Sequence, residues 1–396
     1  MDLARSFNLN DPDFVSDPYP VLARLRSHGK PLWHEEMQLW LAATHADASA
    51  VLRSKTLGRI YTPQEPNEMW ETFNWLHADS IMENEGTKHT RLRALVSKAF
   101  NRGQIERLAP RIEKIVTELL DLCAEKKEFD LLADYAEPLP VRVIAELLGV
   151  SPADAVNLRP WSQAIVKMYE FDVTEAEERA AEKASAEFAE MITEMVEDRK
   201  KNPTEDLVSE LAQVEEAGEK LTLRELIATC VLLLNAGHEA SVNAFGNGFV
   251  AAMNDVKSKE LLLNNPRAIT STAIEEFFRF DAPLQLFERT AMETTEINGI
   301  VMERGSKIAA LLGSANRDEK VFERANYFDL QRNPNNHVSF GGGIHFCLGA
   351  PLARLELGIS MPAFFEHFPN IEISQKPTRR DSFVLRGWSE IKLSHH

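Results

Sequence analysis

A single cysteine in a glycine-rich stretch is the residue of this chain best placed to do chemistry. Cys347 lies in the segment Phe340–Ala350, which reads FGGGIHFCLGA, and a helical pattern of apolar residues begins at Leu348. A cysteine just before a helix N-terminus is favoured as the thiolate, the form that binds iron. The glycines expected to adopt positive φ and to admit a flat ligand are Gly341, Gly342, Gly343 and Gly349. The alternative is a small buried hydrophobic residue, the usual role of a lone cysteine.

This stretch resembles FGxGxHxCxG, the haem-binding loop of the cytochrome P450 monooxygenases in their bacterial, soluble form. The matching positions are Phe340, Gly341, Gly343, His345, Cys347 and Gly349. The resemblance implies that Cys347 is the axial thiolate ligand of a b-type haem, iron protoporphyrin IX. A c-type haem would require a CxxCH attachment site, and the sequence contains none.

A long helix is predicted from Thr222 to about Met253. Thr222 and Glu225 fit a capping box at its start, and the apolar residues that follow indicate burial. Its middle reads NAGHEAS, residues 235–241, where the glycine costs about 1 kcal/mol relative to alanine. An acid and a glycine inside a buried helix indicate either a functional segment or a helix-packing site with a satisfied glutamate.

The family resemblance assigns roles to this segment, which lies over the haem in cytochromes P450. It implies that Ala236 and Gly237 leave room for dioxygen and that Glu239 belongs to the route of proton delivery. Most members have a threonine after the acid, but this chain has Ala240. Ser241 is not a direct replacement, because a shift of one residue rotates a side chain by roughly 100° on a helix. This pattern resembles a minority of macrolide-hydroxylating members, in which a hydroxyl of the substrate is thought to assist.

Three basic side chains are candidates to bind the haem propionates. His89 and Arg93 share one face of a predicted helix at i and i+4, and such donors suit carboxylates. The resemblance adds Arg289, in RTA, and places HxxLR in this helix. The preceding residues, EGTK, differ from the acidic-Pro-Pro-Glu sequence usual in the family. For an HxxxR pair alone, the alternative is a solvated helix face.

Three charged residues resemble the structural ion-pair group of the family. Glu276 and Arg279 form an ExxR pair one helical turn apart, and Arg332 follows in FDLQRNP. An isolated ExxR pair is usually on the surface. The resemblance implies that these three residues are buried behind the haem loop and support Cys347.

Several side chains are predicted, by their position along the family pattern, to line the substrate pocket. They are Trp75, Ile165, Met168, Leu233, Leu284, Leu286, Phe287 and Val384. For Trp75 the alternative is an aromatic cluster that attaches a loop to the core, and for Ile165 and Met168 it is a core stripe. The aromatic residues favour a sizeable, largely apolar substrate.

Composition restricts the class of protein. The chain has 396 residues, 44% of them hydrophobic, and no linker-like run, so we expect one domain over residues 1–396. A net charge of −17 argues against nucleic acid and anionic membranes as partners. No apolar run reaches the ~18 residues of a membrane span, and three scattered cysteines indicate a reducing compartment, so we expect a cytoplasmic protein.

The resemblance implies the cytochrome P450 fold: a mainly helical protein with a small β-rich portion, its haem lying between the long central helix and the helix after Cys347. The resemblance implies a monooxygenase that uses O2 to hydroxylate a small molecule, such as a hydroxyl-bearing macrolide, steroid or other terpenoid or polyketide. The alternatives are a peroxide-driven peroxygenase and a non-catalytic haem or ligand-binding protein.

Electrons must come from a separate protein, because the sequence has no flavin or nicotinamide motif. The resemblance implies a ferredoxin-type donor with its reductase. A basic cluster that could dock an acidic partner comprises Lys88, Arg91, Lys98, Arg102 and Arg107. The alternative is ordinary surface charge.

Overall fold

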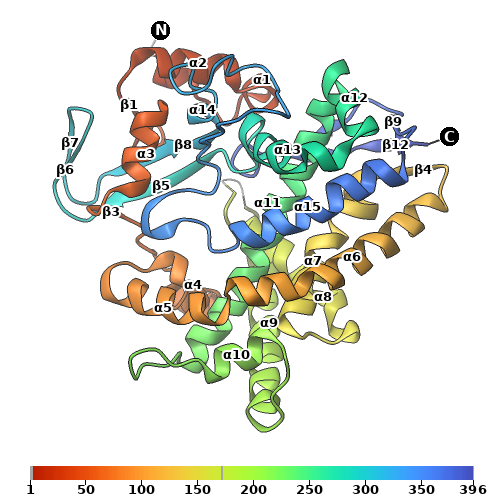
Figure 1. Ribbon diagram of the computed structural model, residues 1–396. Coiled ribbons are helices and arrows are strands. Elements are labelled where there is room, and N and C mark those ends of the chain that lie inside the picture. The colour runs from red at the N-terminus through yellow and green to blue at the C-terminus, as the bar shows by residue number, and fades with distance from the viewer. Residues whose placement is uncertain (1–2, 171–172, 396) are drawn as a thin grey trace.

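The computed structural model describes residues 3–170 and 173–395, and most of this chain is helical (Figure 1). The α-helices are α1 (Pro12–Ser16), α2 (Tyr19–His28), α3 (His45–Arg53), α4 (Glu71–Ala78), α5 (Gly86–Ala99), α6 (Arg102–Ala124), α7 (Pro138–Leu148), α8 (Pro152–Lys167), α9 (Glu175–Lys201), α10 (Leu207–Gln213), α11 (Leu223–Met253), α12 (Val256–Asn264), α13 (Pro266–Phe280), α14 (Leu312–Ala315) and α15 (Ala350–His367). Short helical turns are η1 (Ala4–Ser6), η2 (Asn67–Met69), η3 (Ile81–Glu83), η4 (Leu131–Ala136) and η5 (Gly343–His345). The predicted helical class is confirmed.

The predicted long helix is α11, which runs through the middle of the helical body (Figure 1). Thr222 Oγ1 accepts a hydrogen bond from the Glu225 amide at 3.2 Å, and Glu225 Oε2 accepts one from the Thr222 amide at 2.9 Å. The capping box is therefore confirmed. α11 contacts α4, α7, α8, α9, α13 and α15, which explains its apolar composition. Within the described chain, no helix is both long and apolar enough to span a bilayer.

The β-rich portion lies beside the helical body (Figure 1, left). Its main sheet has the strand order β1 (Leu32–His34), β2 (Leu39–Ala42), β8 (Lys307–Leu311), β5 (Leu286–Ala291) and β3 (Leu57–Gly58). β2 and β8 pair in parallel, whereas the other neighbours are antiparallel. Of the smaller sheets, β6 (Thr295–Ile297) with β7 (Ile300–Met302) lies on this side, whereas β4 (Glu128–Asp130), β12 (Lys392–Ser394) and β9 (Glu372–Ile373) form a sheet near the C-terminus, on the right of Figure 1. β10 (Thr378–Arg379) pairs with β11 (Trp388–Glu390).

Alternation along β8 divides the apolar residues of the sheet between two clusters. Ile308 and Ala310 belong to one cluster, whereas Ala309 and Leu311 belong to the other. A third and larger cluster fills the helical body. α15, the helix that follows Cys347, contacts α6, α11 and α13 and so belongs to that larger core. The cysteine loop therefore enters a helix that is fixed by packing.

Candidate active site

The loop that carries Cys347 is anchored to the helices behind it. The Cys347 amide donates a hydrogen bond to Phe340 O at 2.9 Å. The buried Phe340 ring lies 4.5 Å from the ring of Phe278 on α13, and the Arg354 guanidinium of α15 lies 4.5 Å from its centroid. α15 begins at Ala350, two residues later than the sequence pattern predicts. Cys347 thus lies close to a helix N-terminus on a braced loop.

The four glycines of the loop have different backbone conformations, so the expectation of positive φ at all four is wrong. Gly341 and Gly343 have φ values of +73° and +66°, where a side chain would be strained. A Cβ at Gly343 would also lie 2.5 Å from Leu52 O at the end of α3. Gly342 and Gly349 have φ values of −167° and −80°, which any residue adopts. Gly342 packs against Leu52, where a Cβ would come within 3.3 Å of the Leu52 Cβ.

The electrostatic environment of the Cys347 thiol has opposing parts. Burial raises the pKa of the thiol above its usual value. Hydrogen bonds from the amides of Gly349 and Ala350, together with the charges of Arg93 and Arg354, act to lower that pKa. The amides are the helix N-terminal donors expected from the sequence. By donating to the sulfur, these amides favour the thiolate form. The thiolate is also the form that an iron ion would bind, because a thiol that coordinates a metal loses its proton.

The three predicted propionate donors all lie beside the cysteine loop. The His89 ring is 4.6 Å from that of His345, and Arg93 Nη2 donates to Phe346 O at 2.8 Å. Arg289, on β5, follows Phe287, whose ring would be 3.5 Å from a Cβ at Gly341. The fold therefore brings these side chains from α5 and β5 together beside the cysteine loop.

These donors also have unused hydrogen-bonding capacity, which fits a carboxylate ligand. His89 is buried, and its Nε2 has no hydrogen-bond partner among the described residues. Arg289 is 4% exposed, donates only to Glu288 O within the described chain, and has no carboxylate there within ion-pair distance. Burial, and next the nearby Arg59, lowers the Arg289 pKa to about 10. A buried cation without a counter-ion is costly, so these residues fit the propionates of a haem.

A partner that the sequence analysis missed is Glu85. Its Oε1 lies 2.7 Å from His345 Nε2 and also accepts the Arg59 amide at 2.8 Å. Burial by itself raises the pKa of Glu85, but the hydrogen bonds from His345 and the Arg59 amide outweigh burial and lower it. Glu85 is the acidic residue of the EGTK segment and directly precedes α5. His345 is therefore held by a carboxylate of this chain.

The middle of α11 presents two different faces. Ala236 is exposed, and Leu233, Gly237 and Ala240 are partly exposed, although the helix runs through the interior. These four residues have helical spacing and share one face. His238, Glu239 and Ser241 are buried. One face of α11, which includes the small residues Ala236 and Gly237, is therefore accessible, and Ser241 lies off that face.

Glu239 has a counter-ion that the sequence analysis did not identify. Arg380 Nη1 donates to Glu239 Oε2 at 2.5 Å, and Arg380 also lies 3.8 Å from Glu137. Both Glu239 and Arg380 line a pocket of about 610 Å³, which also includes Val384 and Gln163. Glu239 is only 6% exposed, whereas the Arg380 side chain is 27% exposed. The acid of α11 is thus connected to a surface pocket through one arginine.

The predicted ion-pair group is buried as expected from the resemblance. Arg279 Nε and Nη2 donate to Glu276 Oε2 and Oε1, each at 2.7 Å, and Arg332 Nε lies 3.2 Å from Oε2. Glu276 also accepts the Asp329 amide at 2.8 Å and Asn335 Nδ2 at 3.1 Å. Glu276 and Arg279 are both 0% exposed. This arrangement satisfies the buried charges and joins α13 to the segment before the cysteine loop.

The predicted pocket residues do not all share one surface. Leu233, Leu284, Phe287 and Val384 are partly exposed, and Leu284 forms a β-bridge with Leu385. Ile165, by contrast, is fully buried in the helical core. Trp75, Met168 and Leu286 are partly exposed as well: Trp75 packs under Arg224, Met168 caps α8, and Leu286 packs, like Val384, against the cluster of Phe7 and Phe383. Strand alternation sends Leu286 to the opposite face from Phe287.

The basic cluster around α5 and α6 is largely compensated by acids. Lys88 pairs with Asp79, Arg91 with Glu225, Lys98 with Glu216, and Arg102 with Glu106. Pairing lowers the local positive charge that an acidic partner would meet. The geometry agrees with the alternative of ordinary surface charge.

Comparison with known proteins identifies the class. The family model described as cytochrome P450 matches residues 127–393. The chain is 35% identical to the mycinamicin IV hydroxylase/epoxidase of Micromonospora griseorubida over 93% of this chain and 91% of that protein. The polyketide biosynthesis cytochrome P450 PksS of Bacillus subtilis is 34% identical, and its solved structure, with a TM-score of 0.89, covers 98% of this chain and 99% of that chain. P450BioI, solved with an acyl carrier protein bearing hexadec-9Z-enoic acid, has a TM-score of 0.91 at 29% identity, covering 97% and 99%.

The chain belongs to the cytochrome P450 family. It is a cytochrome P450 monooxygenase with the fold of that family, and membership implies a haem, an organic substrate and O2. Its matches thus include a relative named for the hydroxylation or epoxidation of mycinamicin IV and one named for polyketide biosynthesis.

Proposed function

We propose that this chain binds a b-type haem with Cys347 as the protein ligand of the iron, and that residues 1–396 act as one domain. The observation that carries the proposal is the joint placement of Cys347, near helix N-terminal amides, with three propionate donors beside the same loop. The proposed donors are His89, Arg93 and Arg289. The main hydrophobic cluster, which extends from Trp70 to Leu393, supports the single domain.

When bound, a haem with a thiolate ligand activates dioxygen so that one oxygen atom can enter a C–H bond. The residues of this chain orient and protect that chemistry. Phe340, Gly341, His345 and Gly349 shape the ligand loop, and Ala236 and Gly237 leave space on α11. Glu276, Arg279 and Arg332 support the loop from behind.

Glu239 is proposed to move protons, with Arg380 as the residue that positions it. A carboxylate beside a solvent-connected pocket can exchange protons with water and pass them inward by rotating. Arg380 holds Glu239 Oε2 toward the pocket. Ala240 cannot hold water through a hydroxyl, and Ser241 lies off the accessible face of α11. The hydroxyl that a threonine supplies at this position in most family members must therefore come from water or from the substrate.

The proposed substrate is a sizeable, largely apolar molecule that bears a hydroxyl group, such as a macrolide, steroid or other terpenoid or polyketide. Ala240 supports a hydroxyl-bearing substrate, and the likeness to the mycinamicin hydroxylase and to PksS supports a polyketide-type skeleton. The proposed apolar contacts are the predicted pocket residues whose side chains are partly exposed, namely Trp75, Met168, Leu233, Leu284, Leu286, Phe287 and Val384.

The proposed electron source is a ferredoxin-type donor with its reductase. The sequence supports a separate donor, because it contains no flavin or nicotinamide motif. The paired charges around α5 and α6 argue that the basic cluster is not the main docking determinant. Turnover with peroxide but not with a ferredoxin system would instead establish a peroxygenase.

The absorption spectrum of the reduced, carbon-monoxide-bound protein tests the ligand assignment. Wild type should show a red-shifted, thiolate-type Soret band, and Cys347→Ser should lose or move that band. A band unchanged by the substitution would refute Cys347 as the ligand. Reductant consumption without oxidised product for every hydroxyl-bearing candidate would argue against the substrate class but not against the haem site.

A further inference from the structure

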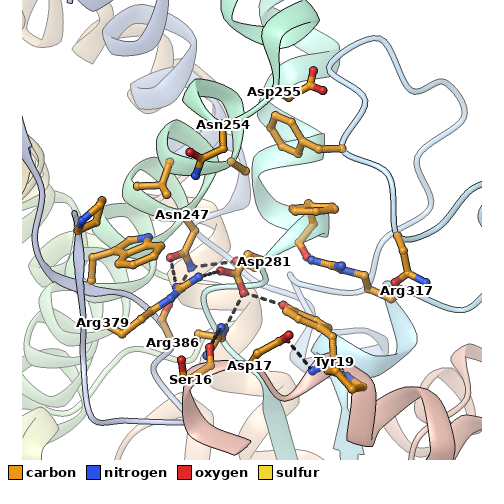
Figure 2. A pocket seen from close by; sticks show the side chains of 18 of the residues that line it. Ser16, Asp17, Tyr19, Asn247, Asn254, Asp255, Asp281, Arg317, Arg379 and Arg386 are labelled. Carbon is orange, nitrogen blue, oxygen red and sulfur yellow. Dashed lines mark hydrogen bonds and ion pairs between the residues drawn. The ribbon is translucent and has the colours of Figure 1, made fainter. Parts of the chain in front are cut away.

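A second pocket lies at the C-terminal end of α11, and its lining residues are distinct from those described around Cys347. A surface pocket of about 1030 Å³ lies between α2, the C-terminal end of α11, the end of α13 and the β10–β11 sheet (Figure 2). None of its lining residues belongs to the Cys347 loop, to α5 or to β5. Its volume lies near the upper end of the range for pockets that hold drug-sized ligands.

Charged groups on the floor of this pocket are rigidly held. Asp281 accepts hydrogen bonds from Tyr19 Oη, Arg386 Nε and Arg379 Nη2, each at 2.7 Å (Figure 2). Arg386 also donates hydrogen bonds from Nη1 to Val15 O at 2.6 Å and from Nη2 to Ser16 O at 2.8 Å. One carboxylate therefore neutralises part of the charge of two arginines, and the group is held without a ligand.

Arg317 differs from these two arginines because no described residue places a carboxylate within ion-pair distance of it. Its guanidinium carbon lies 3.7 Å from the centroids of both the Tyr19 and Phe280 rings, and its Nε donates to Phe280 O at 2.8 Å. Nη1 and Nη2 form no hydrogen bond within the described chain, although the side chain lines the pocket and is only 7% exposed. Two aligned donors on a fixed, stacked guanidinium match the geometry of a carboxylate or phosphate group.

The rest of the lining suits an anion with an apolar body. Cationic lining residues are Arg317, Arg379, Arg386 and Lys376, against the acids Asp17, Asp255 and Asp281. Asp255 Oδ2 is engaged by the Ser258 amide at 2.9 Å, so it caps α12. Trp388, under Arg379 at 3.5 Å from guanidinium carbon to ring centroid, and Phe328 add aromatic surface. This local excess of cations stands out in a chain of net charge −17.

We propose that this pocket binds a small organic anion, whose phosphate or carboxylate accepts hydrogen bonds from Nη1 and Nη2 of Arg317. Its apolar body lies against the aromatic and aliphatic lining between α2 and Trp388. Binding there is separate from the binding of the substrate to be oxidised, so it does not depend on the function proposed for the haem site.

Isothermal titration calorimetry of the haem-loaded full chain tests this site, with phenyl phosphate, benzoate and the neutral analogue phenol as probes. We expect saturable binding of at least one anion, with phenol much weaker, and no change in the Soret band. The anion that binds more tightly identifies the head group. Failure of both anions to bind in low salt would overturn the proposal.

Variants then locate the binding. Arg317→Gln should weaken anion binding at least about tenfold, because a charge-assisted pair of hydrogen bonds is lost. Arg317 also holds Phe280 O, so Ala23→Glu provides a second test: it places a carboxylate in the pocket from the partly exposed side of α2. Arg304→Gln, at an exposed turn outside the pocket, is the matched control and should bind as wild type does. Binding that survives both pocket variants would overturn the assignment.

Discussion

Two buried glutamates of this chain are held in different ways. Glu276 accepts five hydrogen bonds, from Arg279 (two), Arg332, Asn335 and the Asp329 amide, and is 0% exposed. Within the described residues, Glu239 accepts a hydrogen bond only from Arg380, which is itself partly exposed beside a pocket. A carboxylate fixed by five donors is held in one position and supports structure, whereas one that accepts from a single, partly exposed arginine has more freedom to rotate and to exchange protons.

The largest effect is expected at the saturated carboxylate. Glu276→Gln leaves Arg279 and Arg332 buried without a counter-charge, so the free energy of unfolding should fall by about 3–5 kcal/mol and haem incorporation should be lost. The measurements are denaturant unfolding and the ratio of Soret to protein absorbance.

A matched control for that substitution is Glu366→Gln. Glu366 also pairs with an arginine through two hydrogen bonds, to Arg267 at 2.6 and 2.7 Å, but the pair is on the surface. Exposed pairs contribute about 0–1 kcal/mol. Equal losses in the two variants would mean that burial of Glu276 is not what makes it essential.

The singly held carboxylate should affect turnover rather than folding. Glu239→Gln removes a proton-transfer group, so the rate of product formation should fall roughly 100-fold, within the range of general acid–base effects, while haem content stays unchanged. Arg380→Leu should cause a smaller loss, and Arg380→Lys should restore part of it because lysine keeps the charge. The readouts are product formed per reductant consumed and the solvent isotope effect. Full coupling in Glu239→Gln would contradict the proton route.

How much the sequence predicts depends on the distance along the chain between partners. The capping box of α11 and the Glu276–Arg279 pair were predictable because both partners lie three residues apart on a helix. The Glu239–Arg380 and Glu85–His345 pairs join residues 141 and 260 positions apart, so no local spacing in the sequence predicts them. The family resemblance identified Cys347 and His345 as residues of the haem-binding loop, but it did not identify Glu85 as the carboxylate that holds His345.

The pocket residues show the same limit in another form. A helical or strand pattern predicts that Ile165 and Leu286 lie on an apolar face, but it does not predict which residues they pack against. Packing decides that Ile165 joins the helical core and that Leu286 faces the cluster of Phe383. By contrast, local helical spacing is enough to place Ala236 and Gly237 on one face of α11 with Leu233 and Ala240, and that face is the accessible one.

An intermediate effect is expected for Glu275, which lies next to Glu276 but is partly exposed. Burial raises its pKa, but hydrogen bonds from Arg354 and His337 outweigh burial and lower the pKa from 4.5 to about 2. The stabilisation is therefore fully present above pH 4.5 and is lost as the pH falls toward 2. Glu275→Gln should lower the free energy of unfolding by roughly 2 kcal/mol at pH 7. The difference in unfolding free energy between the variant and wild type, measured by denaturant unfolding, should become smaller below pH 4.5. A difference independent of pH would show that charge is not its basis.

The smallest effect is expected on the accessible face of α11, at Ala240. If the substrate supplies the hydroxyl that this chain lacks, Ala240→Thr adds a redundant group and should leave coupling of reductant use to product unchanged on a hydroxyl-bearing substrate. The same variant should improve coupling on a matched substrate in which that hydroxyl is removed, because the threonine then supplies the only hydroxyl. Equal improvement on both substrates would mean that the substrate hydroxyl takes no part, and Glu239 would then depend on water alone for its relay.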